Sequence, residues 1–177
     1  MIAQPGFGKV ALDRPDAYGE SLSQASILVV DDEPGMRNFL AKTFEPRCKR
    51  LAQASCPQAA ADILDGAHFD LIILDNIMPG CTGLDWLSEQ RKIGLYADII
   101  MITAYADLET AIKALRSGVT DFVLKPFRAN QILTAAARVL DRKYLQRDNY
   151  LPRHALSVDG DLAHGRLVGK PSRIQSV

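Results

Sequence analysis

The chain has 177 residues, of which 47% are hydrophobic and 24% are charged, and this suggests one globular domain with tails. The 21 basic and 21 acidic residues give a formal net charge of zero, so the charge indicates neither nucleic-acid nor membrane-surface binding. No apolar run approaches the roughly 20 residues of a membrane span, and the N-terminus lacks the apolar centre of a secretory signal. The three scattered cysteines contain no Cys-x-x-Cys pair, which argues against a zinc site or disulfide framework and favours a cytoplasmic protein.

Residues 1–25 mix Gly, Pro and polar residues without a period, so we expect a mobile N-terminal extension. From residue 26 onward, apolar runs alternate with segments in which apolar residues recur at helical spacing. Pro34 stands near one helix start, and Gly66 and Gly118 stand at two helix ends. The pattern predicts strands at 26–32, 49–55, 69–75, 98–105 and 121–126, and helices at 33–44, 57–66, 83–94, 107–118 and 128–149.

Five strands that alternate with five helices predict an α/β fold with a doubly wound parallel sheet. Continuous apolar runs such as that at 69–75 are typical of strands covered by helices on both faces. The first helix carries Met36, Phe39, Leu40 and Phe44 at helical spacing. From the last helix, we expect Ile132, Leu133, Ala136, Val139 and Leu140 to face the core.

Polar side chains stand at the carboxyl ends of four of the five predicted strands, where ligands bind in an open parallel sheet. These residues are Asp31, Asp32, Asp75, Thr103 and Lys125. Three carboxylates in one pocket repel each other by about 4 kcal/mol per pair at about 4 Å and an effective dielectric near 20, so the cluster requires a cation. All-oxygen ligands suit Mg²⁺, and Lys125 and Thr103 add an ammonium group and a hydroxyl group that suit a phosphoryl group. Asp75 can then act as a nucleophile and become an aspartyl phosphate.

Four segments together carry a resemblance to a known family. "LVVDDEP", "DLIILDNIMPG", "MITAY" and "DFVLKPF" resemble the landmarks of the receiver domain of bacterial two-component response regulators, in order, spacing and strand context. The resemblance covers about residues 26–145. It implies the flavodoxin-like receiver fold, with strand order 2-1-3-4-5 and a long C-terminal helix.

The resemblance also implies a role for each residue at the strand ends. Asp75 would accept a phosphoryl group from a sensor histidine kinase, in a Mg²⁺-dependent reaction that the domain performs only on itself. The implied Mg²⁺ ligands are Asp31, Asp32, Asp75 and the backbone carbonyl of Ile77, and the implied phosphoryl contacts are Thr103 and Lys125. The bond between Lys125 and Pro126 is expected to be cis.

Phe122 takes the place of the family's switch aromatic, although a plain core role is equally compatible with the sequence. On phosphorylation, Thr103 would move inward and Phe122 would turn into the vacated space, remodelling the face made by 107–118, 121–126 and 128–149. Ile77 is apolar, whereas a polar residue two positions after the acceptor can orient an attacking water. We therefore expect slow self-dephosphorylation.

The last helical pattern is longer than a receiver needs, because it continues through Tyr144 and as far as Leu151 before Pro152. This extra length is compatible with a solvated helical end or with a linker helix that pairs two subunits in a short coiled coil. We expect a homodimer through this helix.

Residues 146–177 read as a linker followed by the start of a truncated or missing domain. "LVGKPSRIQSV" resembles the opening of the ATPase domain of sigma-54-dependent transcription activators, although Pro171 and Ser172 invert the usual order. "GRLVGKPS" fails as a nucleotide loop because Gly165 is one residue too close to Gly169. The sequence shows no helix-turn-helix, so the chain itself is expected to contact no DNA.

Three other functions compete with the regulatory part of an activator. A stand-alone receiver that relays phosphate or binds a partner is the main alternative, and the long helix and tail argue against it. An aspartyl phosphohydrolase would need a second carboxylate where Ile77 stands. A flavin mononucleotide carrier would need a Ser-, Thr- and Gly-rich phosphate loop after the first strand, where "DDEP" would repel a phosphate.

Overall fold

The computed structural model describes residues 18–104, 112–114 and 116–150, with side chains up to residue 142. Five parallel strands form one sheet in the order β2-β1-β3-β6-β7. The predicted order in the sheet was 2-1-3-4-5, with the five strands numbered by their place in the chain, and the observed order confirms it. The strands are β1 (Ser26–Val30), β2 (Arg50–Ala54), β3 (Leu71–Asp75), β6 (Asp98–Thr103) and β7 (Asp121–Leu124).

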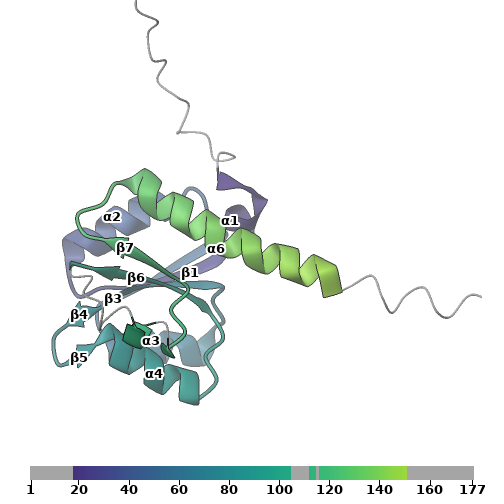
Figure 1. Ribbon diagram of the computed structural model, residues 1–177. Coiled ribbons are helices and arrows are strands. Elements are labelled where there is room, and N and C mark those ends of the chain that lie inside the picture. The colour runs from purple at the N-terminus through teal and green to yellow at the C-terminus, as the bar shows by residue number, and fades with distance from the viewer. Residues whose placement is uncertain (1–17, 105–111, 115, 151–177) are drawn as a thin grey trace, which may run out of the picture.

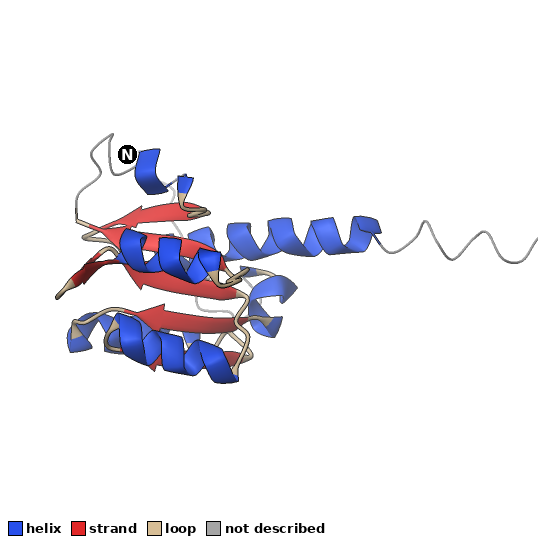
Figure 2. Ribbon diagram, turned by 90° about the horizontal axis from the view of Figure 1, so that it is seen from below, coloured by secondary structure: helices blue, strands red, loops and turns tan. Residues whose placement is uncertain are grey.

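Helices cover both faces of this sheet, as Figures 1 and 2 show. The helices α2 (Pro34–Phe44) and α6 (Ala129–Tyr150) lie on one face, and α3 (Pro57–Gly66) and α4 (Gly83–Lys92) lie on the other. The helix predicted at 107–118 falls mostly outside the described residues, but 112–114 and 116 are helical. No helix in the described part of the chain is both long enough and apolar enough to cross a membrane.

The central strands divide their side chains between two apolar clusters, one under each helical layer. Ile27 and Val29 join the cluster beneath α2 and α6, and Leu28 and Val30 join the cluster beneath α3 and α4. All four side chains are fully buried. Each contributes about 1.5–3 kcal/mol relative to an exposed position, which explains why uninterrupted apolar runs become the middle of the sheet.

The core predicted from the last helix is confirmed, since Ile132, Leu133, Ala136, Val139 and Leu140 are all buried. In α2, Leu40 and Phe44 are buried, whereas Phe39 is 36% exposed. The Phe39 ring packs against Phe127 instead, with the ring centroids 5.9 Å apart. Phe39 therefore shares the helical spacing of Leu40 and Phe44 but contacts the segment after β7 and not the core beneath the sheet.

Two short elements differ from the sequence-based predictions. The last part of the predicted mobile extension is a helix, α1 (Glu20–Gln24), and its Leu22 is only 1% exposed. The expectation of a mobile extension is therefore corrected for residues 18–25, and its remainder lies outside the described residues. After β3, the strands β4 (Ile77–Met78) and β5 (Cys81–Thr82) form a small antiparallel hairpin that leads into α4.

Candidate functional site

The five predicted site residues meet at the carboxyl edge of the sheet, which the hairpin β4–β5 marks in Figure 1. Asp31 and Asp32 follow β1, Asp75 and Thr103 end β3 and β6, and Lys125 follows β7. Asp31, Asp75 and Thr103 are at most 5% exposed, although all three are polar. Burying polar groups without hydrogen-bond partners lowers the stability of the fold, so a core would exclude them. Their gathering at one edge of the sheet therefore indicates a functional site.

The three carboxylates are close enough to share one ligand. One carboxylate oxygen from each of Asp31, Asp32 and Asp75 lies within 4.8 Å of the others. Burial raises the pKa of Asp31, the backbone N–H of Glu33 opposes this shift, and the charge of Asp75 adds to it. The same N–H donates to Asp31 Oδ1 at 2.8 Å and fixes the orientation of that carboxylate.

Lys125 links two of these carboxylates. Its Nζ donates to Asp75 Oδ2 at 2.9 Å and to Asp31 Oδ2 at 3.3 Å. Burial alone would lower the pKa of Lys125, but the bonds to Asp75 and Asp31 outweigh it and hold that pKa above its usual value. The predicted cis peptide bond between Lys125 and Pro126 is present, and the Lys125 N–H donates to the Thr103 carbonyl at 2.9 Å.

Arg37 holds the loop that presents the two N-terminal carboxylates. Its guanidinium donates to the backbone carbonyls of Asp31 at 2.8 Å and Asp32 at 2.9 Å. We did not predict this role from the sequence. The only available signal was the place of Arg37 one turn into α2, since a basic residue there can reach back to the preceding loop.

The backbone around Asp75 is held by close contacts with β6 and with the start of α4. The Asn76 N–H donates to the Ile102 carbonyl at 3.0 Å, and the Gly83 N–H donates to the Asn76 carbonyl at 2.9 Å. Gly83 approaches so closely that a Cβ placed there would lie 2.3 Å from the Asp75 carbonyl oxygen. Gly83 therefore fixes the position of Asp75, and its role was also missed from the sequence.

The two remaining predicted positions are Ile77 and Phe122. Ile77 directly follows the turn after Asp75 and is 54% exposed, so its side chain points to solvent. Phe122 lies on β7 opposite Met101 and packs, half-buried, against the cluster beneath α3 and α4. This packing fits a core aromatic and leaves the switch role to be tested.

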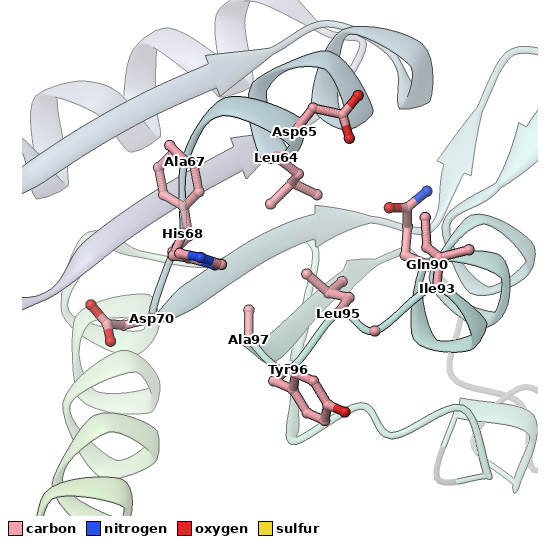
Figure 3. Close-up of a pocket in the computed structure, with 12 residues that line it drawn as sticks. Leu64, Asp65, Ala67, His68, Asp70, Gln90, Ile93, Leu95, Tyr96 and Ala97 are labelled. Atoms are coloured by element: carbon pink, nitrogen blue, oxygen red, sulfur yellow. The ribbon is translucent and has the colours of Figure 1, made fainter.

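A separate hollow of about 390 Å³ lies at the opposite edge of the sheet, before the starts of β3 and β6 (Figure 3). Leu64, His68, Leu95 and Tyr96 are among its lining residues, and Tyr96 is 89% exposed. None of the predicted site residues lines this hollow. It is therefore not part of the acidic site.

Comparisons with known proteins place the chain in a family. The chain is 31% identical over 138 residues to the regulatory protein AtoC of Escherichia coli, a match that covers 78% of this chain and 30% of AtoC. It is 30% identical over 157 residues to the C4-dicarboxylate transport transcriptional regulatory protein DctD of Pseudomonas aeruginosa, which covers 86% of this chain and 33% of DctD. The chain thus spans about a third of the length of these two curated relatives.

A solved structure, the crystal structure of NtrX from Brucella abortus, matches with a TM-score of 0.66 and 31% identity. That match covers 72% of this chain and 29% of NtrX. Residues 27–137 match the response regulator receiver domain, which is more than half of the chain. The chain therefore belongs to the response regulator receiver domain family.

Proposed function

We propose that this chain is a phosphorylation-controlled signalling module in which Asp75 accepts a phosphoryl group from a sensor histidine kinase. The observation that carries the proposal is the contact of Asp75 with the Lys125 ammonium group, at 2.9 Å, inside a cluster of three carboxylates. A buried carboxylate beside a cation and a hydroxyl group is suited to hold a dianionic phosphoryl group.

The donor set fits a magnesium ion. Carboxylate oxygens are the hard ligands that Mg²⁺ prefers. One carboxylate oxygen from each of Asp31, Asp32 and Asp75 lies within 4.8 Å of the others, so all three can reach a single ion. Three carboxylates against the one ammonium group of Lys125 also leave an excess of negative charge that a divalent cation would neutralise. We propose Asp31, Asp32, Asp75 and the backbone carbonyl of Ile77 as its ligands.

In the proposed reaction, a carboxylate oxygen of Asp75 attacks the phosphorus of a phosphohistidine. The new P–O bond forms as the P–N bond breaks, and the departing histidine nitrogen keeps the electron pair and takes a proton from water. Bound Mg²⁺ would supply charge neutralisation at the phosphoryl oxygens. Lys125 and the Thr103 hydroxyl group would contact these oxygens, and the arrangement catalyses only the domain's own phosphorylation and dephosphorylation.

The proposed output is a change between two conformations. Thr103, which is 1% exposed, would be drawn towards the phosphoryl group, and Phe122 would turn into the space that this movement leaves. Phe122 has no hydroxyl group, so packing alone would hold it in the inward state. A shift from 1:99 to 99:1 needs about 5.5 kcal/mol of differential stabilisation.

We further propose that the module is the regulatory part of a cytoplasmic sigma-54-dependent transcription activator, and that α6 and the linker join two copies. Two observations support this context. DctD is named a transcriptional regulatory protein, and its match extends well beyond the receiver residues 27–137. A stand-alone receiver is the alternative, and a continuous reading frame for an ATPase domain after residue 177 would decide between them.

Gel filtration with light scattering tests the proposal, with and without beryllofluoride and Mg²⁺. We expect the wild-type chain to change its oligomeric state only when both are present. Asp75→Asn should abolish the response, whereas Asp65→Asn, which removes one charge from an exposed residue of α3, should leave it unchanged. A wild-type response that survives in Asp75→Asn would overturn the assignment.

A further inference from the structure

Asp31 and Asp32 are held in different ways, although they are neighbours in the chain. The Asp31 carboxylate is buried, and it accepts hydrogen bonds from the Glu33 N–H at 2.8 Å and from Lys125 Nζ at 3.3 Å. Asp32 is exposed, and its carboxylate has no hydrogen bond or ion pair with the residues that the structure describes. The direction in which the Asp32 side chain points is therefore set by its backbone.

The Asp32 backbone lies just beyond the sheet. The Asp31 N–H still donates to the Ala54 carbonyl of β2 at 3.2 Å, whereas Asp32 belongs to the loop that leads to α2. The three carboxylates of the site also repel one another. Without an opposing restraint, this repulsion would turn the exposed Asp32 side chain out towards solvent.

Arg37 supplies a restraint from α2. One terminal nitrogen of its guanidinium, Nη1, donates to the carbonyl of Asp31 at 2.8 Å and to the carbonyl of Asp32 at 2.9 Å. These two bonds hold the peptide groups on both sides of the Asp32 Cα, and they therefore set the direction of its Cα–Cβ bond. Within the described part of the chain, Arg37 binds no carboxylate oxygen, so it leaves the side chains of the loop available as metal ligands.

The helix that carries Arg37 is itself anchored in the core. Leu40 and Phe44 of α2 are fully buried in the apolar cluster beneath α2 and α6. The Arg37 N–H donates to the Glu33 carbonyl at 3.1 Å, which ties the start of the helix to the same loop. The guanidinium thus connects the loop to a rigid element of the fold.

We propose that Arg37 is a positioning residue that holds the Asp32 carboxylate beside those of Asp31 and Asp75 before an ion binds, and that it thereby sets the Mg²⁺ affinity of the site. The inference rests on the proposed function, because it concerns the same site. A ligand set that folding has already brought together binds more tightly, since less ordering remains for the binding step. Groups that orient metal ligands from behind typically change metal affinity by about tenfold to a hundredfold when they are removed.

Two-dimensional NMR with Mg²⁺ as the titrant tests the proposal, read at the amide signals of residues 31–33. Arg37→Ala should raise the Mg²⁺ dissociation constant by about tenfold or more. Arg37→Met keeps an apolar stem on α2, so it protects the test against a folding defect, and it should give the same rise. Lys42→Ala is the matched control, because it removes the same charge from an exposed position of the same helix, and its dissociation constant should stay within about twofold of the wild type.

Two further measurements separate positioning from a general loss of structure. In labelling with acetyl phosphate, Arg37→Ala should need about tenfold more Mg²⁺ to reach half of its maximal rate, but that maximal rate should lie within about threefold of the wild type, because the carboxylates come together again at saturating Mg²⁺. In an Asp32→Asn background, Arg37→Ala should weaken Mg²⁺ binding by less than about threefold, since the carboxylate that Arg37 positions is already gone.

An unchanged Mg²⁺ dissociation constant in Arg37→Ala and Arg37→Met would overturn the inference, and so would an equal loss of affinity with and without the Asp32 carboxylate. Both results leave the proposed function standing, because they require a wild-type chain that binds Mg²⁺ and is labelled at Asp75. A wild-type chain that does neither would overturn the proposed function and this inference together.

Discussion

Gly83→Ala should disturb the acceptor site without touching a charged group. Gly83 begins α4, and a Cβ there would lie 2.3 Å from the Asp75 carbonyl oxygen and 3.0 Å from the Asn76 Cα. Real Cβ atoms essentially never approach another atom closer than 3.0 Å, so the Asp75 backbone and α4 must separate by at least about 0.7 Å. Both atoms belong to backbone, which cannot swing aside as a flexible side chain can.

The magnitude follows from this displacement. Overpacking of a tight contact typically costs about 1–3 kcal/mol, so the free energy of unfolding should fall by that amount. A misplacement of about 1 Å at a reacting group can slow a reaction by about a hundredfold. We therefore expect the rate of phosphorylation to fall by about tenfold to a hundredfold, since Asp75 moves relative to Lys125.

Two assays measure these effects. Urea unfolding can be followed by the fluorescence of Trp86, the single tryptophan, which is 4% exposed. Labelling with acetyl phosphate and Mg²⁺ gives the phosphorylation rate. Gly66→Ala is the matched control, because Gly66 is also helical and has no neighbour within 4 Å, so the change should be neutral or stabilising by up to about 1 kcal/mol. If Gly83→Ala is as stable and as quickly phosphorylated as the wild type, the close-contact reasoning is refuted.

Three further predictions concern single side chains. Ile77 is apolar and exposed and cannot orient an attacking water, so the phosphorylated protein should lose its phosphate slowly. Ile77→Asn should lose its phosphate several times faster. A wild-type half-life of seconds by radiolabel decay would contradict this prediction. Lys125→Ala should fold, by circular dichroism, but give no beryllofluoride response in light scattering, because Asp75 loses its 2.9 Å ammonium contact; a normal response would exclude a role for Lys125. Burial raises the pKa of the Cys48 thiol, so less thiolate forms there at neutral pH. A thiol reagent should therefore modify exposed Cys56 first, and the modification of Cys48 should become faster as the pH rises. Equal modification rates of the two cysteines by mass spectrometry would count against the burial of Cys48.

The sheet could be predicted from the sequence because its signal is continuous. Runs such as "LIIL" have no polar break, and runs of this kind are typical of strands that are covered on both faces. The hairpin of β4 and β5 gave no signal, since two-residue strands show no periodicity. The helix α1 was missed for another reason: its five residues are helical only because Leu22 and Ser21 contact α6, and such tertiary contacts leave no local pattern.

The acidic site could be predicted because each of its residues stands at a strand end, and parallel strands bring those ends to one edge. The sequence could not give the pairing of Lys125 with both Asp31 and Asp75, because that depends on the path of the loop after β7. The roles of Arg37 and Gly83 are three-dimensional as well. Arg37 reaches back to the carbonyl groups of Asp31 and Asp32. Gly83 matters because it has no side chain at the point where its backbone closely approaches that of Asp75.

Mapping the modified residue after incubation with acetyl phosphate tests the central claim most directly. The account predicts that mass spectrometry will find one phosphoryl group on Asp75, that it will form only with Mg²⁺ present, and that it will be absent from Asp75→Asn. A phosphoryl group on a different residue, or equal labelling after removal of Mg²⁺ by a chelator, would contradict the account.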